Sequence, residues 1–344
     1  MHTSFGRDPI PLSRREFLQL GWGGLAFGLR PASSPSPEAG LERLTFATNW
    51  YAQAEHGGFY QALALGFYRE VGLEVSIQMG GTGINILQLL AGGAVDLAMG
   101  SSLDVLAALD SGIPVVTVAA IFQKDPQCLL AHPQTGGGRL ENLRGKPTYV
   151  SPGANLTYWP FLRKRFGFLD EQRRPYYFSL GPFLQDPEAV QQGYLTAEPW
   201  RVKREAGFEP EVYLLADYGY NPYATTIETT WSLVNRHPDR VQRFVDASIR
   251  GWQSYLEDPH PGNQLIRQAN PEMPEELLIY GLDSLLSHQI ITGGEAASLG
   301  IGAMTDQRWQ AIVATMSDIG LFRPTIPYQQ AYTLQFLEKG SRLA

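Results

Sequence analysis

The sequence of 344 residues predicts an α/β protein of two lobes with a ligand cleft between them. Short β-rich runs alternate with segments of helical periodicity, a pattern that is typical of mostly parallel sheets. A turn-rich segment, residues 134–138, interrupts this alternation before a second series begins. Long helical patterns occupy the last third of the chain. Because open α/β sheets bind ligands beyond the carboxyl ends of their strands, we expect the binding site where the two lobes face each other.

The first lobe is expected to begin with residues 41–132. Alternating or continuous apolar runs predict strands at residues 44–47, 73–77, 97–99 and 115–122. Helices are predicted at residues 59–72, 84–91 and 101–112. The last of these helices opens on Ser101 and Asp104, whose spacing is that of a capping box. One strand–loop–helix unit therefore repeats along this part of the chain.

The second lobe is expected in residues 133–228, after which residues 229–344 return to the first lobe. In the second lobe we predict strands at residues 147–150, 176–178, 194–195 and 212–215, with helices at 187–192 and 200–206. Beyond residue 229 the helical patterns occupy residues 238–255, 274–289, 306–319 and 330–337. We expect these C-terminal helices to cover the first lobe.

The N-terminal segment, residues 1–40, has the order of features found in an export signal. The pair Arg14-Arg15 precedes a weakly apolar run, residues 18–29, which is too short to span a bilayer of about 30 Å. Small residues and prolines at 32–37 follow as a cleavage zone. These features predict export to the periplasm by the twin-arginine route. The alternative is a chance arginine pair in a poorly ordered terminus.

The composition excludes several function classes. A net charge of −7 argues against nucleic acid or an anionic membrane as a partner, because either would need a basic face. The single cysteine, Cys128, allows neither an internal disulfide nor a cysteine-cluster metal site, and its apolar neighbours favour a buried, inert thiol. The six histidines are scattered without metal-binding spacing. No metal or cofactor is therefore expected.

A family resemblance is carried by short motifs along nearly all of the mature chain. They are Asn49-Trp50, HGGFY at 56–60, GFYREVGLEV at 66–75, AGGAVDLA at 91–98, GYLTAEP at 193–199 and DYGY at 217–220. The chain resembles the thiamine-pyrimidine-precursor family, which comprises periplasmic solute-binding proteins of ABC importers and fungal pyrimidine synthases. The resemblance implies a type II periplasmic-binding-protein fold, with a hinge and a nitrogen heterocycle in the cleft. It also implies a monomer whose partners are ABC permease and ATPase subunits.

The loop after the first strand carries the first candidate contacts. Trp50 lies on the ligand side of the predicted sheet, where an indole can stack on a flat ring; the alternative is a core tryptophan. Asn49 offers both a donor and an acceptor to a ring edge. The resemblance implies Asp at the position of Asn49 and Pro at that of Ala52. A neutral amide lacks the charge-assisted bond to an amino group, so this departure weakens the case for an aminopyrimidine.

Other candidates come from later loops. Glu198, in the matched segment 193–199, can accept hydrogen bonds from ring donors, although a surface glutamate is the default for this residue type. His56 is either a structural residue or a ligand contact. Ser101 and Ser102 can bind an anionic or carbonyl group at a helix N-terminus, or simply cap that helix. Further ring surface is expected from Tyr60, Tyr158, Tyr218 and Tyr220, some of which must be core.

Three function classes follow. The favoured one is a non-enzymatic binding protein that closes on a small heteroaromatic solute such as a thiamine pyrimidine precursor, with a riboflavin-like ring as an alternative solute. The second is a pyrimidine synthase, which by resemblance would consume its own histidine and use a cysteine-rich iron site. The third is a sulfonate, taurine or nitrate binder, which would favour Arg or Lys in the cleft; the loops assigned to the cleft are poor in both.

Overall fold

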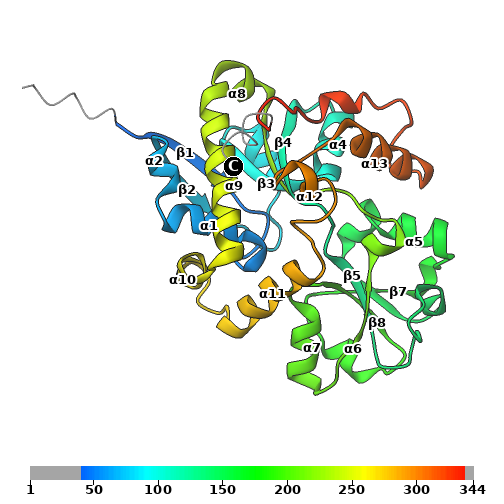
Figure 1. Ribbon diagram of the computed structural model, residues 1–344. Helices are drawn as coiled ribbons and strands as arrows, with labels where there is room; N and C mark the ends of the chain where they lie inside the picture. The colour runs from blue at the N-terminus through cyan, green and yellow to red at the C-terminus, as the bar shows by residue number, and fades with distance from the viewer. Residues whose placement is uncertain (1–39, 338–344) are drawn as a thin grey trace, which may run out of the picture. The chain divides into compact units, whose positions relative to one another are not determined.

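The computed structural model describes residues 40–337, which contain two five-stranded sheets with helices packed around them (Figure 1). The expected fold class, two α/β lobes, is confirmed. The twin-arginine pair and the rest of residues 1–39 lie outside the described residues, as do residues 338–344. Within residues 40–337, no helix combines the length and apolar character needed to cross a membrane.

The first sheet has the strand order β2-β1-β3-β10-β4. Its strands are β1 (Glu42–Ala47), β2 (Leu73–Gln78), β3 (Leu97–Ser101), β4 (Val115–Phe122) and β10 (Ala224–Thr230). β1 pairs in parallel with β2 and β3, whereas β10 is antiparallel to both β3 and β4. Every residue of β4 is buried, as expected for a continuous apolar run covered on both faces. All four strands predicted for this part of the chain are present.

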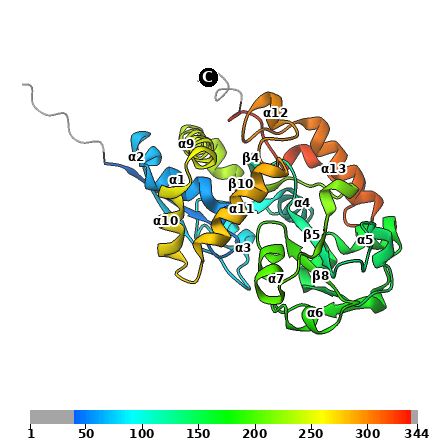
Figure 2. The ribbon, with the colours of Figure 1, turned by 60° about the horizontal axis from the view of Figure 1, so that its bottom comes forward.

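The helices of the described chain that lie outside the second-lobe segment come from both ends of the chain. They are η1 (Ala54–His56), α1 (Gly57–Ala64), α2 (Phe67–Glu70), α3 (Ile86–Ala91), α4 (Ser102–Asp110), α8 (Trp231–Arg236), α9 (Pro238–Glu257), α10 (His260–Ala269), α11 (Glu275–Ser287), α12 (Ala296–Leu299), α13 (Asp306–Asp318) and η6 (Tyr328–Gln330). α9 packs against α1 in both views (Figures 1 and 2). A Cβ at Gly58 would lie 2.2 Å from the Trp252 ring, so this close approach requires glycine.

The second sheet has the order β7-β6-β8-β5-β9. Its strands are β5 (Gln127–Ala131), β6 (Thr148–Val150), β7 (Arg173–Pro175), β8 (Val190–Tyr194) and β9 (Glu211–Leu214). Its helices are η2 (Leu140–Leu143), η3 (Pro152–Leu156), α5 (Trp159–Phe166), η4 (Asp170–Gln172), α6 (Gly181–Gln185), α7 (Glu198–Ala206) and η5 (Leu215–Tyr218). β6 is parallel to β7 and β8, and β5 is antiparallel to β8 and β9.

The chain changes sheets a few residues earlier than the expected lobe boundaries. β5, expected in the first lobe within 41–132, belongs to the second sheet, and β10 already belongs to the first sheet although we expected the return at residue 229. The two crossings therefore occupy residues 123–126 and 215–223. We placed the first lobe boundary at the turn-rich segment 134–138. The chain in fact changes sheets earlier, inside the β-rich region that precedes this segment.

Three predicted elements are wrong. The helix expected at 187–192 is replaced by β8, a central strand whose Gln191 is fully buried; the two glutamines hid the strand pattern. The strand expected at 176–178 ends at Pro175, so those residues form a loop. The helix expected at 330–337 is also absent. There the backbone pairs with the outer edge of β4, through Thr117 N–H to the Ala331 carbonyl (2.9 Å) and Thr333 N–H to the Thr117 carbonyl (3.0 Å).

Candidate functional site

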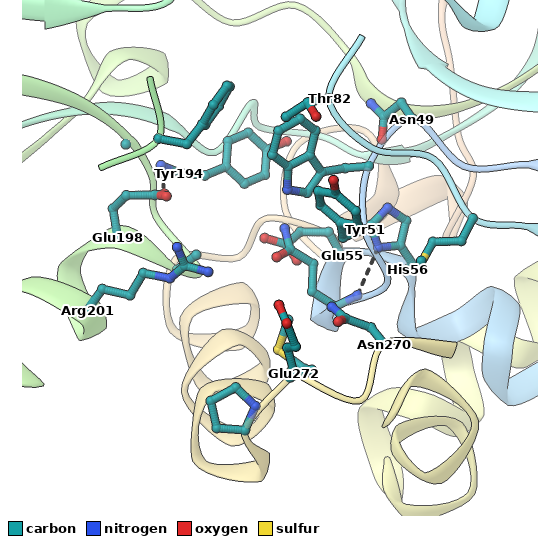
Figure 3. Close-up of a pocket in the computed structure, with 18 of the residues that line it drawn as sticks. Asn49, Tyr51, Glu55, His56, Thr82, Tyr194, Glu198, Arg201, Asn270 and Glu272 are labelled. Carbon is teal, nitrogen blue, oxygen red and sulfur yellow. Dashed lines mark hydrogen bonds between the residues drawn. The ribbon is translucent and has the colours of Figure 1, made fainter. Parts of the chain in front are cut away.

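A cleft of about 840 Å³ lies between the two sheets, at the ends of their strands (Figure 3). Its walls come from the first lobe, the second lobe and the connection between α10 and α11. The lining residues are Asn49, Trp50, Tyr51, Gln53, Glu55, His56, Met79, Thr82 and Met99 from the first lobe; Gln127, Tyr176, Phe178, Gln192, Gly193, Tyr194, Ala197, Glu198 and Arg201 from the second; and residues 269–274 from the connection.

The loop after β1 is held in place by the loop after β2. The Thr48 hydroxyl donates to the Trp50 carbonyl (3.0 Å) and accepts from the Gly80 N–H (3.2 Å). A Cβ at Gly80 would lie 2.3 Å from the Thr48 carbonyl oxygen, so only glycine allows the two loops to meet. This contact positions the half-buried Trp50 at the cleft.

Aromatic rings from both lobes meet at the cleft. The Trp50 ring lies 5.4 Å from that of Tyr51 and 5.0 Å from that of Phe178, between ring centroids. Phe178 in turn lies 5.2 Å from Tyr176. These separations fall within the range of favourable aromatic pairs. The cleft therefore offers apolar π surface suited to a flat ring.

His56 presents a buried donor to the cleft. Its Nδ1 accepts a hydrogen bond from the Gln53 backbone N–H (3.2 Å), which places the ring proton of the neutral imidazole on Nε2. Burial lowers the pKa of His56 to about 4, so the ring is neutral at pH 7. Nε2 is buried and has no hydrogen-bond partner. The expected candidate His56 thus lines the cleft with an unpaired N–H, and its neighbour Gln53 fixes the tautomer.

Glu55 joins the two lobes beneath the cleft. It is 2% exposed, and the hydroxyl of Thr196, from the second lobe, donates to its Oε1. Burial raises the pKa of Glu55 to about 7, with the nearby Glu198 charge acting in the same direction. Sequence reasoning missed this residue, because a glutamate beside a predicted helix normally faces solvent.

α7 presents a carboxylate and a guanidinium to the cleft. Glu198 accepts a hydrogen bond from the Tyr194 N–H (2.7 Å), and burial raises the pKa of its carboxyl. Arg201 follows three residues later, so both side chains lie on one helix face (Figure 3). The cleft loops looked poor in cations, and Arg201 was missed although its spacing from Glu198 could have indicated it.

Gln192, on β8, is a further missed residue. Its Oε1 accepts from the Ser151 N–H (2.5 Å) and from the Tyr158 hydroxyl (2.8 Å). Two donors on the oxygen orient the amide, whose NH₂ group is then free to serve the cleft. Tyr158, which we expected in the site, is buried behind Gln192 and acts on the cleft through it.

The segment between α10 and α11 reaches the cleft from far along the chain. Asn270, between α10 and α11, donates through Nδ2 to the Ala52 carbonyl (3.0 Å) and so ties residues 269–274 to the first-lobe loop. Glu272 in this connection is exposed at the cleft. The prolines at 271 and 274 mark a turn, but no sequence pattern places that turn at the site.

Six of the ten expected site residues lie away from the cleft lining: Tyr60, Ser101, Ser102, Tyr158, Tyr218 and Tyr220. Ser101 caps α4 in a capping box with Asp104. Ser102 is buried, where its hydroxyl accepts from the Tyr223 N–H (3.1 Å). For both serines the helix-capping or structural alternative holds, because their oxygens already have partners.

The other three tyrosines among these six, Tyr60, Tyr218 and Tyr220, are packing residues. Tyr60 is buried in the cluster formed with α10 and α11. Tyr220 is buried against Phe161, at 5.5 Å between ring centroids. Tyr218 packs edge-on to Phe166, at 5.9 Å. Asn49, Trp50, His56 and Glu198 are therefore the expected residues that the fold brings together at one cleft.

Comparison with known proteins identifies a family and several relatives that cover most of the chain. The NMT1/THI5-like family model matches residues 53–261. The chain is similar to the riboflavin-binding protein RibY of Chloroflexus aurantiacus, with 27% identity over 322 residues, which are 90% of this chain and 91% of that protein. It is also similar to the formylaminopyrimidine-binding protein of Halalkalibacterium halodurans, with 34% identity over 294 residues, or 82% and 87% of the two chains.

A third relative carries the name of an enzyme. The 4-amino-5-hydroxymethyl-2-methylpyrimidine phosphate synthase of Legionella pneumophila is 26% identical over 245 residues, which are 67% of this chain and 75% of the synthase. Among solved structures, the periplasmic aliphatic sulphonate-binding protein SsuA of Escherichia coli superposes with a TM-score of 0.64 at 13% identity, covering 84% of this chain and 91% of that one. This likeness shows the periplasmic-binding-protein fold.

Proposed function

The chain belongs to the NMT1/THI5-like family, and from this premise we propose that it is the solute-binding protein of an ABC importer. The solute is a flat nitrogen heterocycle held between the two lobes. Relatives that cover most of the chain are named as binding proteins for such ring compounds. The two-lobed fold supports the same role, because lobes of this kind close around a ligand by hinge motion.

The chemistry of the cleft carries the proposal. A nitrogen heterocycle combines an apolar face with donors and acceptors around its edge. Trp50 offers a stacking surface, the unpaired Nε2–H of His56 offers a donor, and Glu198 offers an acceptor. These groups come from two lobes, so a ring between them contacts both and favours the closed arrangement.

The size of the cleft leaves room for a fused ring. Its volume of about 840 Å³ lies in the upper part of the range for ligand sites, roughly 300–1,000 Å³. Asn49 is also neutral and cannot give an amino group the charge-assisted bond of a carboxylate. We therefore place riboflavin-like rings first as the ligand class and an aminopyrimidine second.

The proposed location is outside the cytoplasm, where the binding proteins of importers meet their permease. The twin-arginine pair Arg14-Arg15 supports export in a folded state. Fractionation of cells that produce the tagged full chain tests this point. Recovery of the uncleaved chain in the cytoplasm alone would contradict it.

A pyrimidine synthase is the second candidate function, because relatives with that name match the chain. The resemblance ties this chemistry to a cysteine-rich iron site, whereas the chain contains one cysteine, Cys128, which is buried. We propose binding without turnover. Iron-dependent formation of a pyrimidine product by the purified protein would replace this proposal with the synthase.

Titration calorimetry with riboflavin and with formylaminopyrimidine tests the binding site. Trp50→Ala should weaken binding by about 1–3 kcal/mol through lost stacking. Glu198→Gln should weaken it by about 1.5–3 kcal/mol, because the carboxylate accepts from the ligand. Glu205→Gln, on the same helix but exposed to solvent, is the matched control. Wild-type affinity in both site variants would place the ligand elsewhere.

A further inference from the structure

One loop of the second lobe combines backbone strain with a contact across the cleft. Phe178, 46% exposed, has a φ of +60°, in the left-handed region that a bulky side chain rarely adopts. Four non-glycine residues in the described part of the chain have positive φ, and Phe178 is the member of this group that lines the cleft. Strained backbone of this kind gathers at ligand clamps and switches.

Backbone–backbone hydrogen bonds flank the loop around Phe178, and beside it the Ser179 hydroxyl accepts from the Gly181 N–H (3.3 Å). The Tyr176 N–H donates to the Val150 carbonyl (3.1 Å), and the Leu180 carbonyl accepts from the Leu184 N–H (2.9 Å). Between them, residues 177–179 make no backbone–backbone hydrogen bond. The loop can therefore change conformation without breaking the second sheet.

The contact that the Phe178 ring makes is the one a ligand ring would need. Phe178 lies 5.0 Å from Trp50, between ring centroids, with an angle of 43° between the planes. A flat ring placed between them would need about 4.5 Å or more to each neighbour. The present spacing does not leave that room. A ligand ring that stacks on this side of Trp50 would therefore have to displace the Phe178 ring.

We propose that Phe178 is an aromatic gate that selects for flat ligands. In the conformation described, the Phe178 ring packs on Trp50, and a ligand ring takes its place as the loop moves. A solute without a flat ring cannot replace the lost ring contact, so the gate disfavours aliphatic solutes. This inference rests on the proposed function, since it assumes that a ring stacks on Trp50.

The covered state can be tested without any ligand. With 5-fluorotryptophan in place of tryptophan, the ¹⁹F resonance of residue 50 is assigned by its loss in Trp50→Phe. We expect Phe178→Ala to shift this resonance and to increase its exposure to a solvent paramagnet. Tyr177→Ala, which removes a neighbouring side chain that is 79% exposed, should change neither. An unchanged residue-50 signal in Phe178→Ala would overturn the gate.

Stopped-flow binding with riboflavin as the probe tests the competition. If the gate is open for about a tenth of the time, Phe178→Ala should bind riboflavin about tenfold faster than wild type. Phe178→Gly, which also removes the strain at positive φ, should bind at least as fast. Slower or unchanged association in both variants would overturn the gate and make Phe178 an ordinary wall of the site. If riboflavin binds no variant, the proposed ligand class fails, while the ¹⁹F result still decides whether Phe178 covers Trp50.

Discussion

The two sheets share one strand order but differ in extent. In each, three parallel strands are followed by one antiparallel strand, β10 in the first sheet and β5 in the second, and then by an edge strand. The antiparallel strand is always the first one after a crossing. In the first sheet, β4 and β10 have 8 and 7 residues, whereas β5 and β9 have 5 and 4. The first sheet is also the one that the long C-terminal helices cover, so we expect it to hold most of the stability.

Carboxylates at equivalent positions in the two lobes have different roles. After the third strand of the first sheet, Asp104 accepts from the Ser101 N–H (2.9 Å) and the Ser101 hydroxyl (2.8 Å). After the third parallel strand of the second sheet, Glu198 accepts from the Tyr194 N–H. Only Glu198 lines the cleft. A carboxylate at the start of a helix remains a candidate ligand contact when no side chain of the preceding strand donates a hydrogen bond to it, as the Ser101 hydroxyl does to Asp104.

The comparison between the lobes is tested most strongly by Trp252→Ala. Trp252 is fully buried in the first lobe and packs edge-on to Phe59 and Phe122, each at 5.7 Å between ring centroids. Truncation should lower the free energy of unfolding by about 3–5 kcal/mol, measured by urea unfolding with circular dichroism. Trp159→Ala removes a buried tryptophan from the second lobe. Its effect on hydrogen exchange should remain within that lobe. Equal loss of protection in α9 would show that both lobes unfold together.

The pH dependence of stability tests the contact between the lobes. The pKa of Glu55 is about 7 in the folded protein, against 4.5 for the ordinary group. The folded state therefore binds more protons between these values, and its stability falls as pH rises from about 4.5 to about 7. Glu55→Gln keeps an acceptor for Thr196 and should remove on the order of 3 kcal/mol of this dependence. Urea unfolding at pH 5 and pH 8 provides the measurement. Parallel pH profiles for the two proteins would rule out a buried protonated Glu55.

The smallest of the three effects concerns the crossings. Arg308, on α13, donates through Nη2 to the carbonyls of Gln123 (3.1 Å) and Asn221 (2.9 Å), one in each crossing. Arg308→Met should lower the free energy of unfolding by about 1.5–3 kcal/mol, because these are charge-assisted hydrogen bonds. Arg323→Met, which removes an exposed ion pair with Asp110, should cost less than about 1 kcal/mol. Thermal unfolding compares the two. Similar losses would mean that Arg308 holds the crossings no more firmly than a surface pair.

Local patterns predicted most of the fold because the buried faces are apolar. The first four strands and α4 with its capping box were predicted where they occur. β8 was missed because two glutamines stand in its centre. Gln192 has its partners, Ser151 and Tyr158, in other elements, and such partners are invisible in a local window. The segment beyond Gln330 was assigned a helix because its apolar spacing fits one, whereas the exposed edge of β4 offered it backbone partners.

The candidate site was predicted best where one loop carries it; Glu198 is the expected lining residue that comes from elsewhere. Asn49, Trp50 and His56 lie close together in the sequence, after the first strand, and they line the cleft together. Phe178, Arg201 and residues 269–274 reach the same cleft from distant parts of the chain. Their positions depend on how the two sheets and α11 are assembled, which residue type and spacing do not encode. The aromatic residues were the hardest to assign, because a buried ring and a stacking ring look alike in a sequence.

The pairing beside each crossing has a further consequence. Phe122, the last residue of β4, pairs with Ala224, the first residue of β10, so the chain leaves the first sheet and re-enters it at neighbouring positions. In the second sheet, Cys128 near the start of β5 likewise pairs with Leu214 at the end of β9. The second lobe thus occupies the place of a hairpin loop between β4 and β10. In topology the second lobe is an insertion between two paired antiparallel strands. Its two ends are adjacent, and a short turn from β4 to β10 could replace it.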